Sequence, residues 1–130
     1  FGVPRKNIDV LQIGTRYDYK LFKIAPIKLY HDVPQCGYRA LFDDYKVIYM
    51  TDTKTVEGIS AKNYDLYLVE GNYDEDDIEE RIKEKQQDCK YVYEFRAKES
   101  HLSKQQASEF LLNNMGENSE YVLMHQHVER

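Results

Sequence analysis

The chain has 130 residues, of which 42% are hydrophobic and 13% aromatic, and its formal net charge is −5. These values predict a single folded domain with a modest core and exclude a disordered chain. The acidic balance provides no broad basic field, so we expect no general binding to nucleic-acid backbone.

The first half of the chain alternates apolar and polar residues, as is typical of strands. We expect a hairpin turn at 43–45 and a short helical turn over 56–62. The strand expected at 64–70 has an apolar centre, which predicts burial on both of its faces. The other strands are expected at 8–13, 19–24, 27–30, 37–42 and 46–50.

The second half of the chain changes to helical spacing. Residues 74–87 carry acids at the start and lysines near the end, which suits a helix dipole. Ser103 and Gln106 form a capping box for a second helix, which Gly116 ends before a last strand at 121–124. This order, a β-meander followed by β-α-α-β, predicts an α/β fold with a mixed, mostly antiparallel sheet and two or three helices. The apolar face of the second helix consists of Ala107, Phe110, Leu111 and Met115.

No stretch is apolar enough over about 20 residues to cross a membrane, and no signal peptide is present, so we expect a cytoplasmic protein. Cys36 and Cys89 are the only cysteines, and we expect reduced, partly buried thiols. Because the chain starts at Phe1 and stops at Arg130, just after a strand-like run, we expect it to be part of a longer reading frame or a product of processing.

Acid and imidazole side chains follow several of the expected strands. His31 follows the strand at 27–30, Asp52 follows the strand at 46–50, and His125 follows the strand at 121–124. Side chains at the ends of neighbouring strands can converge, and imidazole with carboxylate is a ligand set that zinc, iron and manganese accept. The wide spacing excludes a local metal loop, so a sheet would have to assemble the site.

Five short segments resemble, in this order, motifs of the metallo-β-lactamase fold hydrolases, and especially of the branch that acts on phosphodiesters. The resemblance covers roughly residues 18–127. The segments are YHDVPQCGY (30–38), YMTDT (49–53), LYLVEGNY (66–73), HLS (101–103) and VLMH (122–125).

The resemblance implies half of an αββα sandwich and a specific set of site residues. Residues 1–130 would be one domain similar to the carboxy-terminal half of the fold, without the half that carries His-x-His-x-Asp-His. His31, Asp52 and His125 would be metal ligands, with Asp52 bridging two ions, and His101 would face a substrate phosphate. The complete enzyme would hold two zinc ions, with manganese or iron as alternatives, and would hydrolyse a small phosphorylated or phosphodiester substrate. With at most three ligands and Lys54 in place of the family's usual glycine, the isolated chain is expected to be inactive.

Each of these residues also has a simpler interpretation. His31 can be a loop histidine, and Asp52 can cap its turn. His127 competes with His125 as the ligand, since both lie on one strand face. His101 can belong to the cap region of a helix or bind an anion there.

Other polar residues near these positions are expected to be structural. We expect Asp32 and Glu70 to support the site rather than bind metal, and we expect the acids at 74–77 to form a solvated helix start.

Two further functions stay open. The chain can act without catalysis, by pairing its uncovered sheet face with a second copy or with the missing half. It can also be an unrelated small α/β domain, which predicts that His31, Asp52 and His125 lie far apart.

Overall fold

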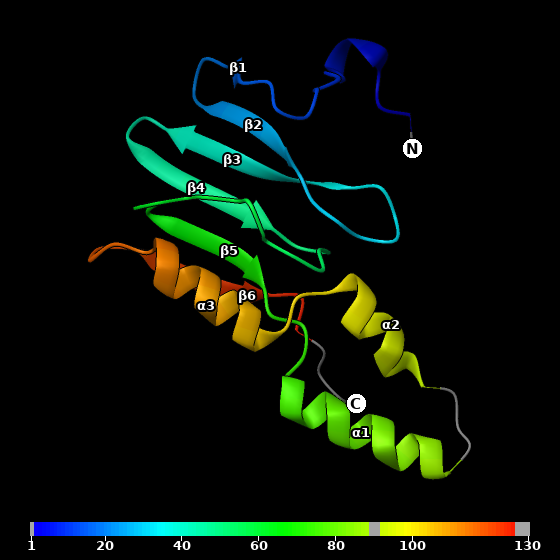
Figure 1. The fold of residues 1–130 in the computed structure, drawn as a ribbon. Coiled ribbons are helices and arrows are strands. Elements are labelled where there is room, and N and C mark those ends of the chain that lie inside the picture. Colours follow the sequence, from blue (N-terminus) through cyan, green and yellow to red (C-terminus); the bar gives the residue numbers. More distant parts are fainter. Residues whose placement is uncertain (1, 89–91, 127–130) are drawn as a thin grey trace.

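The computed structural model describes residues 2–88 and 92–126, and its centre is a mixed sheet of six strands in chain order (Figure 1). This confirms the expected α/β class. The strands are β1 (Tyr17–Asp18), β2 (Lys23–Lys28), β3 (Cys36–Phe42), β4 (Tyr45–Met50), β5 (Leu66–Glu70) and β6 (Glu120–Met124). The helices are a 3-10 turn η1 (Arg5–Asn7), α1 (Glu75–Gln87), α2 (Tyr93–Ser100) and α3 (Lys104–Asn114).

The strand directions determine where the strand ends meet. β1 to β4 form an antiparallel meander, whereas β5 joins β4 in parallel and β6 joins β5 in parallel. Because β2 and β4 are both antiparallel to β3, the strands β2, β4, β5 and β6 all point the same way. Their carboxyl ends therefore lie along one edge of the sheet.

Helix α3 covers one face of the sheet and forms the core there. It begins with the predicted capping box of Ser103 and Gln106. Phe110 packs edge-on against Tyr67, with 6.3 Å between ring centroids, and the Tyr67 hydroxyl donates to the carbonyl of Ala61 at 2.6 Å. The buried strand residues on this face are Ile48, Met50, Tyr67 and Val69.

The opposite face of the sheet is less well covered. Tyr38, Tyr49, Leu68 and Val122 are register partners across four adjacent strands, so their side chains share this face. Val122 is 48% exposed, and the other three are half-buried. The expectation that β5 is buried on both faces is therefore only partly met, because Leu66 and Leu68 on this face are half-buried, whereas Tyr67 and Val69 on the α3 side are fully buried.

Several expected elements at the amino-terminal end are wrong. Residues 8–13 form no strand, because no neighbouring strand pairs with them, and Val10 is 86% exposed. Residues 19–22 form a turn, in which the Tyr19 amide donates to the carbonyl of Phe22 at 2.9 Å. Strand β2 passes through Pro26, which is tolerated because β1 is too short to need an amide donor there.

Two other differences concern the helices. Residues 56–62 contain turns and no helix, and α2 lies where no helix is expected from the sequence. Helix α2 has too few apolar positions for a stripe, since its buried residues are Glu94, Ala97 and Ser100. Helix α1 is confirmed, with Asp74 as its cap, and both α1 and α2 extend away from the sheet (Figure 1). Among the described residues, every helix is too short or too polar to span a bilayer.

Candidate metal and catalytic site

Candidate site residues collect at the edge where the four co-directional strands end. Asp52 lies two residues after β4, Glu70 is the last residue of β5, and His125 directly follows β6. His31 lies three residues after β2. The parallel pairing thus explains why side chains so distant in sequence meet in one place.

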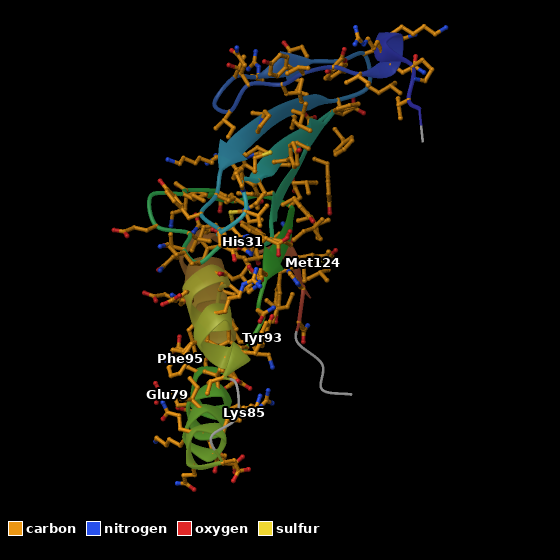
Figure 2. All side chains as sticks on the ribbon, turned by 90° about the vertical axis from the view of Figure 1, so that its right-hand side faces the viewer. His31, Glu79, Lys85, Tyr93, Phe95 and Met124 are labelled. Atoms are coloured by element: carbon orange, nitrogen blue, oxygen red, sulfur yellow. The ribbon has the colours of Figure 1, made fainter. Side chains whose placement is uncertain are left out.

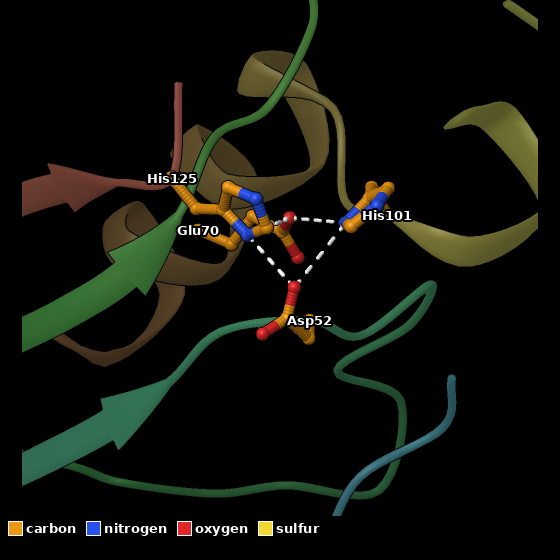
Figure 3. A group of neighbouring side chains, drawn as sticks. All are labelled: Asp52, Glu70, His101 and His125. Carbon is orange, nitrogen blue, oxygen red and sulfur yellow. Dashed lines mark hydrogen bonds and ion pairs between the residues drawn. The ribbon is translucent and has the colours of Figure 1, made fainter. Parts of the chain in front are cut away.

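Three of these residues, Asp52, Glu70 and His125, are joined by His101, which directly follows α2, and the donor atoms of the four lie within 4.8 Å of one another (Figure 3). His125 Nδ1 lies 2.8 Å from Asp52 Oδ1, and His101 Nδ1 lies 2.6 Å from Glu70 Oε1. The two pairs are also close to each other, since His125 Nδ1 lies 3.4 Å from Glu70 Oε1 and His101 Nδ1 lies 3.8 Å from Asp52 Oδ1.

The donor set fits a divalent transition metal. Zinc binds imidazole nitrogen and carboxylate oxygen at about 2.0–2.2 Å, which places neighbouring ligands of a tetrahedral site roughly 3.4 Å apart. The four separations above, from 2.6 to 3.8 Å, scatter around that value. Two nitrogens and two carboxylate oxygens also suit manganese or iron.

Glu70 connects the parts of the cluster. Its side chain is fully buried, and while Oε1 meets His101, Oε2 accepts hydrogen bonds from the backbone amides of Thr53 at 3.0 Å and Leu102 at 3.5 Å. The carboxylate therefore fastens the loop after β4 to the segment before α3. This agrees with the expected structural role and adds a donor atom that the sequence interpretation did not assign to the site.

The loop that carries Asp52 is also tied to the segment that carries His31. The Tyr30 amide donates to Thr53 Oγ1 at 3.1 Å, and the Lys54 amide donates to the carbonyl of Tyr30 at 2.8 Å. The Gln35 side-chain amide donates to the carbonyl of Asp52. Thr53 is fully buried, so the position of Asp52 is set by the interior of the protein.

Asp52 and His125 both adopt the left-handed backbone region, with φ of 55° and 50°. This region costs a non-glycine residue roughly 1–3 kcal/mol and persists only where the surroundings enforce it. At His125 the enforcing contact is the Asn72 side-chain amide, which donates to the His125 carbonyl at 2.8 Å. Asp43 and Asn63, in the turns before β4 and β5, adopt the same region, so it is not confined to the two adjacent candidate ligands.

His31 lies next to the four-residue cluster. Its ring centroid is 5.0 Å from that of His101, which in turn is 5.0 Å from that of His125, so the three imidazoles form a row of neighbouring rings. In Figure 2, His31 lies beside the carboxyl end of α2. His31 Nδ1 also lies 2.8 Å from Asp32 Oδ1. Arg96 donates two hydrogen bonds to Asp32 Oδ2, at 3.0 and 2.8 Å, and holds the pKa of that carboxyl below its usual value. Asp32 therefore stays ionised beside His31.

The structure thus brings Asp52, His101 and His125 together, with His31 one ring away. This contradicts the unrelated domain in which the candidate ligands lie far apart. The rival ligand His127 lies outside the described residues, as does Cys89, whereas Cys36 is a free thiol. The only sequence signal for Glu70 was an acid at the end of a strand with an apolar centre.

Comparisons with known proteins support the fold. No protein-family model matches the chain, and no curated protein matches it. A solved structure of the metallo-β-lactamase fold protein YhfI from Bacillus subtilis matches with a TM-score of 0.66 and 17% identity, over 94% of this chain and 44% of that one. The short form of human tRNase Z matches with a TM-score of 0.55 and 17% identity, over 85% of this chain and 38% of that one. The chain has part of the metallo-β-lactamase fold and spans less than half the length of either structure.

Proposed function

We propose that this chain is the carboxy-terminal part of a metal-dependent hydrolase that acts on phosphodiesters. The observation that supports this most is the strand-end cluster of Asp52, Glu70, His101 and His125. Its position in part of a metallo-β-lactamase fold adds to that support, as does the phosphodiester substrate that the name tRNase implies for one similar structure.

Within this proposal, the residues divide into metal ligands and a substrate-facing group. Asp52, His125 and His31 would hold the metal, and the two carboxylate oxygens of Asp52 would allow it to bridge two ions. Two zinc ions, when bound, supply Lewis acidity that polarises a phosphoryl oxygen and lowers the pKa of water. His101 is oriented by Glu70 through Nδ1, so its other ring nitrogen, Nε2, is the one available to a phosphate oxygen.

The proposed site is incomplete in the chain alone. In this proposal Glu70 Oε1 and His101 Nδ1 hold each other, so Asp52, His125 and His31 are the ligands that remain. Three ligands shared between two ions leave each ion short of the three or four protein ligands that hold a zinc ion firmly. We therefore expect the isolated chain to bind zinc weakly and to be inactive, and we expect the other half of the fold to supply the remaining ligands.

Zinc titration of the chain tests the proposed ligands. Asp52→Asn and His125→Ala are each expected to weaken zinc binding by about tenfold or more, because each removes a donor from a site that has few. Isothermal titration calorimetry in a buffer that does not chelate metal measures the affinity. His127→Ala is the matched control, since it removes an imidazole two residues further along the sequence, and it is expected to leave the affinity unchanged.

Two results would contradict the assignment. Tight, stoichiometric zinc binding by the unmodified chain would show that the site is complete without a second half. Zinc binding that is equally strong in the Asp52→Asn variant would show that the ion binds elsewhere.

Self-association is the second candidate function, and the partly exposed row of Tyr38, Tyr49, Leu68 and Val122 favours it. An apolar sheet face that is open to water is a site for pairing. If the chain acts in this way, light scattering is expected to give the mass of a dimer, and Val122→Asp is expected to give a monomer because it places a charge in the paired face. A monomer at all concentrations would rule out self-association as the function.

A further inference from the structure

A groove of about 880 Å³ opens beside His31, outside the four-residue cluster. Three segments form its walls: the end of β2 with the residues that follow it, the loop after β4, and the carboxyl half of α2. The groove therefore continues from the row of imidazoles along the surface of the protein.

The groove is basic in an acidic chain. Four cations line it, namely Lys28, Lys54, Arg96 and Lys98, against the two carboxylates of Asp32 and Glu99. Since the whole chain has a net charge of −5, this is a local concentration of positive charge and not a general property of the surface.

The four cations differ in the strength of their interactions with other groups of the protein. Arg96 is committed to Asp32 through two hydrogen bonds. Lys98 pairs with Glu79 at 3.3 Å, but both side chains are well exposed, so this pair is weak and easily exchanged. For Lys54, the described part of the chain offers no carboxylate within ion-pair distance. Lys28 Nζ lies over the Tyr30 ring, 4.9 Å from its centroid, and is engaged in a cation–π contact. Lys54 and Lys98 are thus the cations most available to a ligand.

Each wall of the groove carries a cation and a candidate site residue on the same short segment. Lys28 precedes His31, Lys54 follows Asp52, and Lys98 precedes His101. Because the same backbone segments position both groups, the cations lie at a fixed offset from the candidate catalytic groups. If a substrate places its reacting phosphodiester at the cluster, a neighbouring anionic group of the same molecule would lie in the groove.

We propose that this groove binds a second phosphate group of the substrate, held by Lys54 and Lys98. The inference rests on the proposed function, which places a phosphodiester at the cluster, and it narrows the substrate to molecules with at least two phosphates. Two ammonium groups suit a phosphate because each is a point charge with several donors. Two kinds of molecule carry a second phosphate next to a phosphodiester: a small polyphosphate ester and a nucleotide chain.

The test is a titration of the metal-free, isotope-labelled chain followed by NMR. The probes are inorganic pyrophosphate and a 5′-phosphorylated thymidine dinucleotide, which separate the small source from the chain-like source. The amide signals of Lys54 and of residues 96–99 are expected to shift, and the affinity is expected to fall as salt is added. The double variant Lys54→Ala/Lys98→Ala is expected to bind at least about tenfold more weakly, since each lysine contributes one charge-assisted contact.

Two matched variants sharpen the result. Glu99→Gln removes a carboxylate from the groove and is expected to strengthen binding by about twofold, because like charge no longer repels the phosphate. Lys20→Ala removes an exposed lysine from the turn before β2 and is expected to have no effect. Unchanged signals at the groove with both probes, or equal losses in the double variant and in Lys20→Ala, would overturn the proposal.

The design also separates this inference from the proposed function. Asp52→Asn should retain phosphate binding in the groove while it loses zinc. Phosphate binding in the groove without any zinc binding would refute the metal-dependent hydrolase and leave only a phosphate-binding groove. Zinc binding without phosphate binding in the groove would refute the groove proposal alone.

Discussion

Replacing Glu70 by alanine is expected to lower the free energy of unfolding by about 3 kcal/mol, because a buried, multiply bonded carboxylate is lost. The amides of Thr53 and Leu102 would lose their acceptor, and the His101 ring would lose the partner at 2.6 Å that orients it. Glu70 is fully buried, so water cannot readily replace these bonds. Urea unfolding of the metal-free chain, followed by circular dichroism, measures the change.

Two other glutamate variants serve as controls for that experiment. Glu70→Gln keeps a carbonyl acceptor of nearly the same shape and is expected to cost about half as much. Glu79→Ala breaks only an exposed pair with Lys98 and is expected to cost at most about 0.5 kcal/mol. If Glu70→Ala were as stable as Glu79→Ala, the proposed fastening of the β4 loop to the segment before α3 would be wrong.

The parts of the fold that the sequence predicts are those whose local pattern agrees with their final packing. Helix α3 is an example, since its capping box and apolar face both specify the same element. Helix α2 could not be predicted, because what it buries is Glu94, Ala97 and Ser100 rather than an apolar stripe. The false strand at 8–13 is the converse case: alternation is present, but no neighbouring strand pairs with it.

The site could be predicted as a set of strand ends but not as a geometry. Polar residues after apolar runs indicated His31, Asp52 and His125, and in the structure Asp52 contacts His125 while the His31 and His125 rings each neighbour that of His101. Their convergence depends on β4, β5 and β6 being parallel, and strand order is a property of the whole chain that no local spacing encodes. Glu70 was not predicted to be a site residue for the same reason, since only the parallel pairing brings its carboxylate to His101.

Gly37→Ala is the second substitution for which we expect a large effect, a loss of about 3 kcal/mol in the free energy of unfolding, because it overpacks a rigid part of the sheet. A Cβ atom there would lie 2.5 Å from the backbone oxygen of Tyr49 and 3.0 Å from a methyl group of Leu29. A backbone oxygen cannot move away as a side chain can, so β3 and β4 would have to separate. That movement would displace Asp52, which follows β4, from the histidines.

Substitutions at two other glycines serve as controls with smaller expected effects. At Gly71 a Cβ atom would meet only the side chain of Leu123, at 3.3 Å, which can rotate, so Gly71→Ala is expected to cost less than about 1 kcal/mol. At Gly2 no heavy atom lies within 4 Å, and Gly2→Ala is expected to leave stability unchanged. Urea unfolding of the three variants should follow this order, together with loss of zinc binding in Gly37→Ala alone. Equal stability of Gly37→Ala and Gly2→Ala would show that β3 and β4 do not approach as closely as described, and the position of Asp52 would then need another explanation.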